Sequence, residues 1–238
     1  MDKTRVQSLP ALDPGGGFGR TALQLLGLAA LPLALQVARV AYFGRLIHLG
    51  IVWNLFLAWL PLGFAWLAVR PGATPKVVRG VAAMAWLLFL PNAPYLVTDL
   101  MHLRSSAGMP ILYDVVQWFS AALCGLALGL VSLRWVQSAV SAWLGVWPGR
   151  LFGLGALGAA GFGMYLGRYL RWNSWDVLVR PAALAHDIWL RVRHPVHYWQ
   201  AWALVLLFAS LLVCVYSVLN PLLATGEKGR ESPNRRVA

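Results

Sequence analysis

Six apolar runs, each about 20 residues long, constrain the fold of this 238-residue chain more than any other feature. An α-helix of about 20 apolar residues can span a bilayer, because it satisfies its own backbone hydrogen bonds. The runs cover approximately residues 21–43, 49–69, 78–101, 112–133, 151–171 and 198–223. Only 12% of the residues are charged, whereas soluble proteins carry about a quarter. We therefore predict an all-α, polytopic transmembrane bundle of about six spans.

The rest of the chain divides into tails and connections. We expect residues 21–223 to form a single transmembrane domain between a polar N-terminal tail (1–20) and a disordered C-terminal tail (224–238). The tryptophan-rich run 135–148 is too short to span a bilayer, which favours an interfacial helix. The longest connection, 172–197, mixes arginine and aspartate with tryptophan and aliphatic residues. This mixture predicts an amphipathic segment along the membrane surface.

The net charge of +12 would suggest nucleic-acid binding in a soluble protein. Here the arginines and lysines lie between the apolar runs and in the tails, where such residues set topology and contact lipid headgroups. We therefore expect membrane lipids as partners and no nucleic acid. Positive charge is denser on the side that holds both tails, so the positive-inside rule places both termini in the cytoplasm. No cofactor motif is present, and none is expected.

The third apolar run is interrupted at Leu90-Pro91-Asn92-Ala93-Pro94-Tyr95. Two prolines three residues apart remove backbone donors and break a helix. Lipid cannot satisfy a broken backbone, so protein or trapped water must supply the missing partners. Asn92, Tyr95, Asp99 and His102 follow at intervals of three, four and three residues, which places them on one stripe of a helix.

The predicted topology gathers polar residues at one membrane face, because the third and fifth spans end there and the second and fourth begin there. Such residues are expensive within a membrane, so they pair with one another or perform a function. We expect Arg168 and Arg171 to pair with Asp99 and Asp114. The candidate polar pocket consists of Asn54, Asn92, Tyr95, Asp99, His102, Asp114, Arg168, Arg171, Asn173 and Asp176.

The spacing favours structural interpretations for some of these features. His102 has the chemistry of a general base or a metal ligand, but a single interfacial histidine is more often a polar cap. Asp99, His102 and Asp114 lack a tight paired-ligand motif, so no metal is expected. Small residues recur every four positions in the fourth and fifth spans, which predicts that these spans pack against each other through the small faces. The two ladders are Ala121, Gly125, Gly129 and Gly155, Ala159, Gly163, Gly167.

Four sequence blocks resemble a bacterial multi-pass membrane family known as "domain of unknown function 1361". The blocks are Trp53–Trp59 (WNLFLAW), Leu90–Tyr95 (LPNAPY) continuing to Asp99, Tyr113-Asp114, and Gly167–Asp176 (GRYLRWNSWD). The resemblance covers about residues 50–220. It implies a multi-pass protein of the bacterial cytoplasmic (inner) membrane, and it implies no activity, cofactor or established site.

Three functions are compatible with these observations. Our leading hypothesis is that a one-sided polar pocket binds or transports a small or amphiphilic, lipid-like ligand, because transporters use broken helices to expose backbone groups. The alternative is a membrane-embedded enzyme acting on a lipid or lipid-linked phosphate, with Asp99 or Asp114 as base and the arginines on the phosphate. The third is a non-catalytic scaffold with a structural ion-pair network. No catalytic motif favours an enzyme, and the sequence does not predict the oligomeric state.

Overall fold

The computed structural model describes residues 16–44, 46, 48–70, 72, 74–103 and 110–228, without the side chains of residues 16–18, 102 and 221–228. This part of the chain is built from helices and contains no strand, as predicted. The elements are α1 (Gly16–Phe43), α2 (Gly50–Val69), α3 (Lys76–Phe89), α4 (Asn92–Tyr95), the 3-10 helix η1 (Leu96–His102), α5 (Ile111–Leu144), α6 (Val146–Tyr169), α7 (Asp176–Val179), α8 (Pro181–Arg193) and α9 (Trp199–Lys228).

Five helical stretches in the described residues are long and apolar enough to cross a membrane: Gly19–Phe43, Gly50–Val69, Lys76–Met101, Ile111–Leu144 and Trp199–Asn220. The remaining predicted span, the fifth (151–171), corresponds to α6. This helix has a similar length, but seven of its 24 residues are glycine, which lowers its hydropathy below that of the others. The chain is therefore a multi-pass membrane protein with an all-α transmembrane bundle.

Some element boundaries differ from the prediction. Residues 135–144 continue α5 as one helix of 34 residues, so the predicted interfacial helix at 135–148 was wrong. The reason is tertiary packing, since Leu133 and Val136 are buried in the same apolar cluster as Leu157 of α6. Gly145, with φ +101°, then makes the turn into α6. Helix α9 also continues past residue 223, to Lys228.

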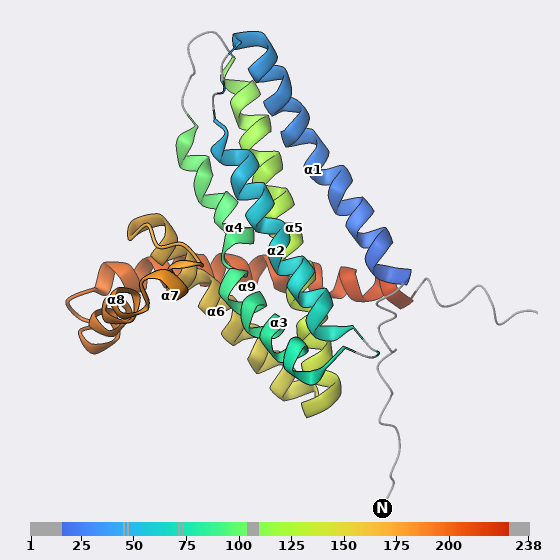
Figure 1. Cartoon of the computed structure of the whole chain (residues 1–238), viewed down its shortest axis with the longest axis vertical. Coiled ribbons are helices and arrows are strands. Elements are labelled where there is room, and N and C mark those ends of the chain that lie inside the picture. Colours follow the sequence, from blue (N-terminus) through green and yellow to red (C-terminus); the bar gives the residue numbers. More distant parts are fainter. Residues whose placement is uncertain are drawn as a thin grey trace, which may run out of the picture.

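Helix α5 runs the length of the bundle and organises its neighbours (Figure 1). Helix α2 lies beside it, α1 leans on its first half, and α6 packs against its second half. Helix α9 contacts α6 and crosses the bundle at a steep angle to α2 and α5. The helices α7 and α8 lie to one side, beyond the C-terminal end of α6.

Glycine residues of α5 and α6 pack closely against the broken third span. A Cβ on Gly125 would overlap the backbone oxygen of Ala93, and one on Gly129 would lie 3.1 Å from the Ala93 Cβ. On α6, a Cβ on Gly163 would overlap the ring of Pro91. Helices α5 and α6 pack against each other as predicted, but through Gly149 and Gly153 of α6, whereas Gly125, Gly129 and Gly163 of the predicted ladders face the break. The small faces give the broken segment the room that its proline rings and the Ala93 backbone occupy.

Candidate functional site

The break at Pro91 is satisfied by protein groups, as the sequence predicted. Ser174, in the loop after α6, donates its hydroxyl to the backbone oxygen of Leu88 in the last turn of α3 (3.1 Å). The side-chain amide of Asn92 donates in turn to the Ser174 hydroxyl oxygen (2.9 Å). These bonds attach the loop after α6 to the opened helix, over a separation of more than 80 residues in the sequence.

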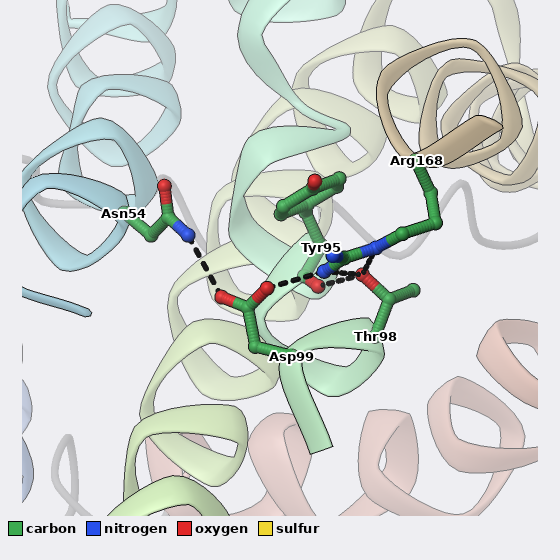
Figure 2. A network of polar contacts seen from close by, with 5 residues as sticks. All are labelled: Asn54, Tyr95, Thr98, Asp99 and Arg168. Carbon is green, nitrogen blue, oxygen red and sulfur yellow. Dashed lines mark hydrogen bonds and ion pairs between the residues drawn. The ribbon is translucent and has the colours of Figure 1, made fainter. Parts of the chain in front are cut away.

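Asp99 joins three elements (Figure 2). One carboxylate oxygen forms an ion pair with the Arg168 guanidinium of α6, and the other accepts a hydrogen bond from the side-chain amide of Asn54 on α2 (2.7 Å). Asp99 itself lies on η1 and is 3% exposed. The predicted pairing of Asp99 with Arg168 is confirmed, and both carboxylate oxygens are engaged.

Arg168 is held on two further sides. Its Nε and Nη2 donate to the hydroxyl of Thr98 at 2.9 and 2.7 Å, and its guanidinium lies over the Tyr95 ring, 4.5 Å from the centroid. Figure 2 shows Tyr95 and Thr98 on either side of the guanidinium. A 3-10 helix has three residues per turn, so Tyr95 and Thr98 share a side, and the Thr98 hydroxyl also donates to the Tyr95 carbonyl (2.6 Å).

A cavity of about 700 Å³ adjoins this network. Its walls come from α2, the α3–α4 break, α6, the loop at 171–174 and α8. The lining includes six residues of the predicted pocket: Asn54, Asn92, Tyr95, Arg168, Arg171 and Asn173. Most other lining residues are aliphatic or aromatic, among them Leu87, Leu88, Phe162, Leu166 and Ile188. Along α6 the lining runs from Ala159 to Arg168, and we call the Arg168 side the polar end of this amphiphilic cavity.

Arg171 stands out at the polar end. It lines the cavity and is exposed, and no hydrogen bond or ion pair engages its guanidinium within the described residues. It follows the C-terminal end of α6 with φ +59°, a left-handed conformation that glycine usually provides after a helix. The expected pairing of Arg171 with a carboxylate is thus absent from the described part of the chain.

Two carboxylates, those of Asp176 and Asp187, hold the loop that carries Arg171. Asp176 accepts a hydrogen bond from the backbone N–H of Asn173 (2.8 Å) and pairs with Arg180 (3.3 Å). The hydrogen bond from the Asn173 backbone, followed by the contacts with Arg180, lowers the pKa of Asp176 below its ordinary value. The Trp172 indole donates to Asp187 of α8 (2.8 Å). These contacts hold the loop while leaving Arg171 unengaged.

Asp114 belongs to a different network, which corrects the expected pairing with Arg168 or Arg171. It forms a buried ion pair with Arg39 of α1, and each residue is only 1% exposed. The Arg39 Nε donates to Gln117 (3.0 Å), and Gln117 donates to Gln36 (2.7 Å). Helix α1 packs along α5, so the first turn of α5 faces α1. Asp114 therefore braces two helices and does not line the cavity.

The other predicted residues are distributed as follows. The side chain of His102 lies outside the described residues. Asp176 holds the loop through Asn173 and Arg180 and does not line the cavity. Thr98 and Ser174 belong to the site and were not predicted, and Arg39 was not predicted as the partner of Asp114. The sequence did contain a signal for Arg39. Gln36 and Arg39 are three residues apart inside an apolar run, and Asp114 and Gln117 have the same spacing in another run, so the two polar pairs could face each other. Thr98 and Ser174 had no such signal, since their roles depend on the 3-10 helix and on the path of the loop.

The comparison with known proteins identifies a family. Residues 53–215 match the family described as "Protein of unknown function (DUF1361)". The chain belongs to this family. The match includes the break, the Asp99–Arg168 network and the loop that carries Arg171, whereas Arg39 lies outside it. No curated protein and no solved structure matches the chain.

Proposed function

We propose that this DUF1361 family member binds, and through binding handles or transports, a small amphiphilic ligand in the cavity beside the broken third span. The observation that carries the proposal is the mixed lining of the 700 Å³ cavity, in which two arginines and several uncharged polar side chains stand beside a larger set of apolar residues. Its volume lies in the range of 300–1,000 Å³ that is typical of ligand pockets. Along α6 the apolar lining residues precede Arg168, so the cavity matches a molecule with a polar head and an apolar tail.

The length of the cavity supports a ligand that lies along the membrane normal. The lining residues on α6 extend from Ala159 to Arg168, and the loop adds Arg171. At about 1.5 Å per residue, the helical part from Ala159 to Arg168 spans roughly 14 Å, slightly less than half of the ~30 Å hydrocarbon core. A tail that reaches from the polar end to Ala159 would therefore occupy about one leaflet.

An enzymatic role for Asp99 has less support. A general base needs a carboxylate within reach of the proton that it removes, but both oxygens of Asp99 are bound, by Arg168 and Asn54. The Asp99–Arg168 pair fits a brace that shapes the polar end of the cavity. In this proposal the ion-pair network and the ligand site are neighbouring parts of one structure.

We also propose residence in the bacterial inner membrane with both termini in the cytoplasm. The support is the excess of arginine and lysine on the side that holds the tails and the family resemblance. Fusion of a cytoplasm-active and a periplasm-active reporter to the C-terminus tests the orientation, and activity of the periplasmic reporter would reverse it.

The binding proposal is tested by site-directed blockage. The full-length protein in nanodiscs is photolabelled with a single-chain amphiphile that carries a diazirine in its tail, and the labelled peptides are mapped by mass spectrometry. Ala159→Trp fills the cavity wall, whereas Leu154→Trp adds the same indole to an exposed position of α6 that does not line the cavity. We expect saturable labelling of the 87–101 and 159–171 regions that Ala159→Trp removes and Leu154→Trp keeps. Labelling that spreads evenly over lipid-facing helices, or that Ala159→Trp leaves unchanged, would contradict the proposal.

A further inference from the structure

The charge and size of the cavity specify the class of ligand, and this inference rests on the proposed binding function. We infer that the cavity takes a single-chain amphiphile whose head group carries one negative charge, held by Arg171. A long-chain carboxylate and a single-chain phosphodiester share this chemistry.

The single charge follows from the ionisable groups at the polar end. Two charged side chains, Arg168 and Arg171, occur among the described lining residues, and no lining residue there is a carboxylate. The ion pair with Asp99, which lies behind the wall, neutralises Arg168. One positive charge is left, on Arg171. A monoanion therefore brings the net charge of these lining residues to zero, whereas a dianion leaves one negative charge unpaired.

The conformation of Arg171 strengthens this assignment. A non-glycine residue at φ +59° is strained, and strained residues that the surrounding structure holds in place cluster at ligand-binding sites. The Arg171 guanidinium makes no hydrogen bond or ion pair among the described residues that would explain why arginine occupies this position. Its planar fork matches a carboxylate or phosphate group, so a bound anion supplies the missing partner.

The single chain follows from volume. A water molecule occupies about 30 Å³ in the liquid, so 700 Å³ holds roughly 23 groups of that size. This number fits one acyl chain with a compact head group, it is too small for a diacyl phospholipid, and a larger head group would extend outward past the exposed Arg171. The apolar wall formed by Leu88, Phe162 and Ile188 provides a surface for one tail.

The test is direct equilibrium binding to the full-length protein in phosphatidylcholine nanodiscs, with empty nanodiscs as the background. Four radiolabelled amphiphiles carry the same 16-carbon chain: palmitate and lysophosphatidylglycerol (monoanions), lysophosphatidic acid (a dianion) and monopalmitoylglycerol (neutral). We expect both monoanions to bind at least tenfold more tightly than the neutral lipid and more tightly than the dianion. The ratio of palmitate to lysophosphatidylglycerol affinity distinguishes a carboxylate from a phosphodiester source.

Variants assign the preference to Arg171. Arg171→Gln should reduce the preference for monoanions to less than about threefold, and Arg171→Lys should retain most of it. Arg193→Gln removes an exposed arginine of α8 that does not line the cavity, and it should leave the preference unchanged. If the neutral lipid binds as tightly as the monoanions, if the dianion binds most tightly, or if Arg171→Gln keeps the preference, the charge inference is wrong while the binding proposal stands. If none of the four binds saturably, the binding proposal fails as well.

Discussion

Arg171→Gly separates a functional arginine from a structural one, because the two roles predict opposite changes in stability. Arg171 sits at φ +59° after the end of α6. A left-handed conformation costs a non-glycine residue about 1–3 kcal/mol, and glycine removes this cost. Glycine also raises the conformational entropy of the unfolded chain, which reduces the gain in stability by about 0.4–1 kcal/mol. No hydrogen bond or ion pair is lost among the described residues. The net expectation is a protein between unchanged and about 2 kcal/mol more stable.

Thermal unfolding in a mild detergent, followed by intrinsic tryptophan fluorescence, measures this change. One kcal/mol corresponds to roughly 2–4 °C in the melting temperature for a domain of this size. Arg171→Ala is the matched control, because it removes the same side chain but keeps the left-handed strain, so its melting temperature should stay near the wild-type value. A melting temperature of Arg171→Gly that falls by several degrees would show that the arginine stabilises the fold, and the reasoning about a ligand-binding role would be refuted.

Three further predictions concern the structure around the cavity. Asp99→Asn leaves the largely buried Arg168 without its counter-ion, so it should destabilise the protein by about 3–5 kcal/mol. A double-mutant cycle with Arg168→Ala, measured by denaturant unfolding, should show strong coupling between the two residues, and additive effects would contradict a stabilising ion pair. Gly125→Ala would force a methyl group into the Ala93 carbonyl and should cost about 1–3 kcal/mol. Gly155→Ala, with open space around it inside α6, should instead stabilise the protein by about 0.4–1 kcal/mol, and equal melting temperatures would contradict the close packing at Gly125. The pKa of Asp176 is lowered in the folded protein, so the stability that the ionised carboxylate contributes is complete above its unfolded pKa of about 3.9 and is lost as the pH falls through the folded pKa. Melting temperatures measured between about pH 3 and 6 should depend on pH, and Asp176→Asn should reduce this dependence. An unchanged dependence in Asp176→Asn would contradict the lowered pKa.

The sequence predicted the class of the protein and half of the site because both depend on local properties. Runs of about 20 apolar residues are membrane spans regardless of how they pack, and Pro91 and Pro94 break a helix in any context. The excess of polar residues at one end of the second, third and fifth spans also predicted the meeting of Asn54, Asp99 and Arg168. That part of the site could be derived by counting spans.

Tertiary structure decided how these groups are partnered. Asp114 could have faced several helices, and it meets Arg39 because α1 lies along the first turns of α5. The glycine ladders were visible in the sequence, but Gly125, Gly129 and Gly163 pack against the broken segment, while α5 and α6 meet through other positions. A helix face shows what can pack closely without showing which neighbour does so.

The cavity and the unengaged charge in it also needed the three-dimensional structure. The sequence alone determined a polytopic helical membrane protein with an opened third span and a set of polar residues near one face. The tertiary structure decided that Arg168 is neutralised by Asp99 and that the end of α6 turns Arg171 into a cavity of about 700 Å³ without a partner among the described residues. The physical reason is that pairing depends on distances between helices, and these distances are set by packing across the whole bundle.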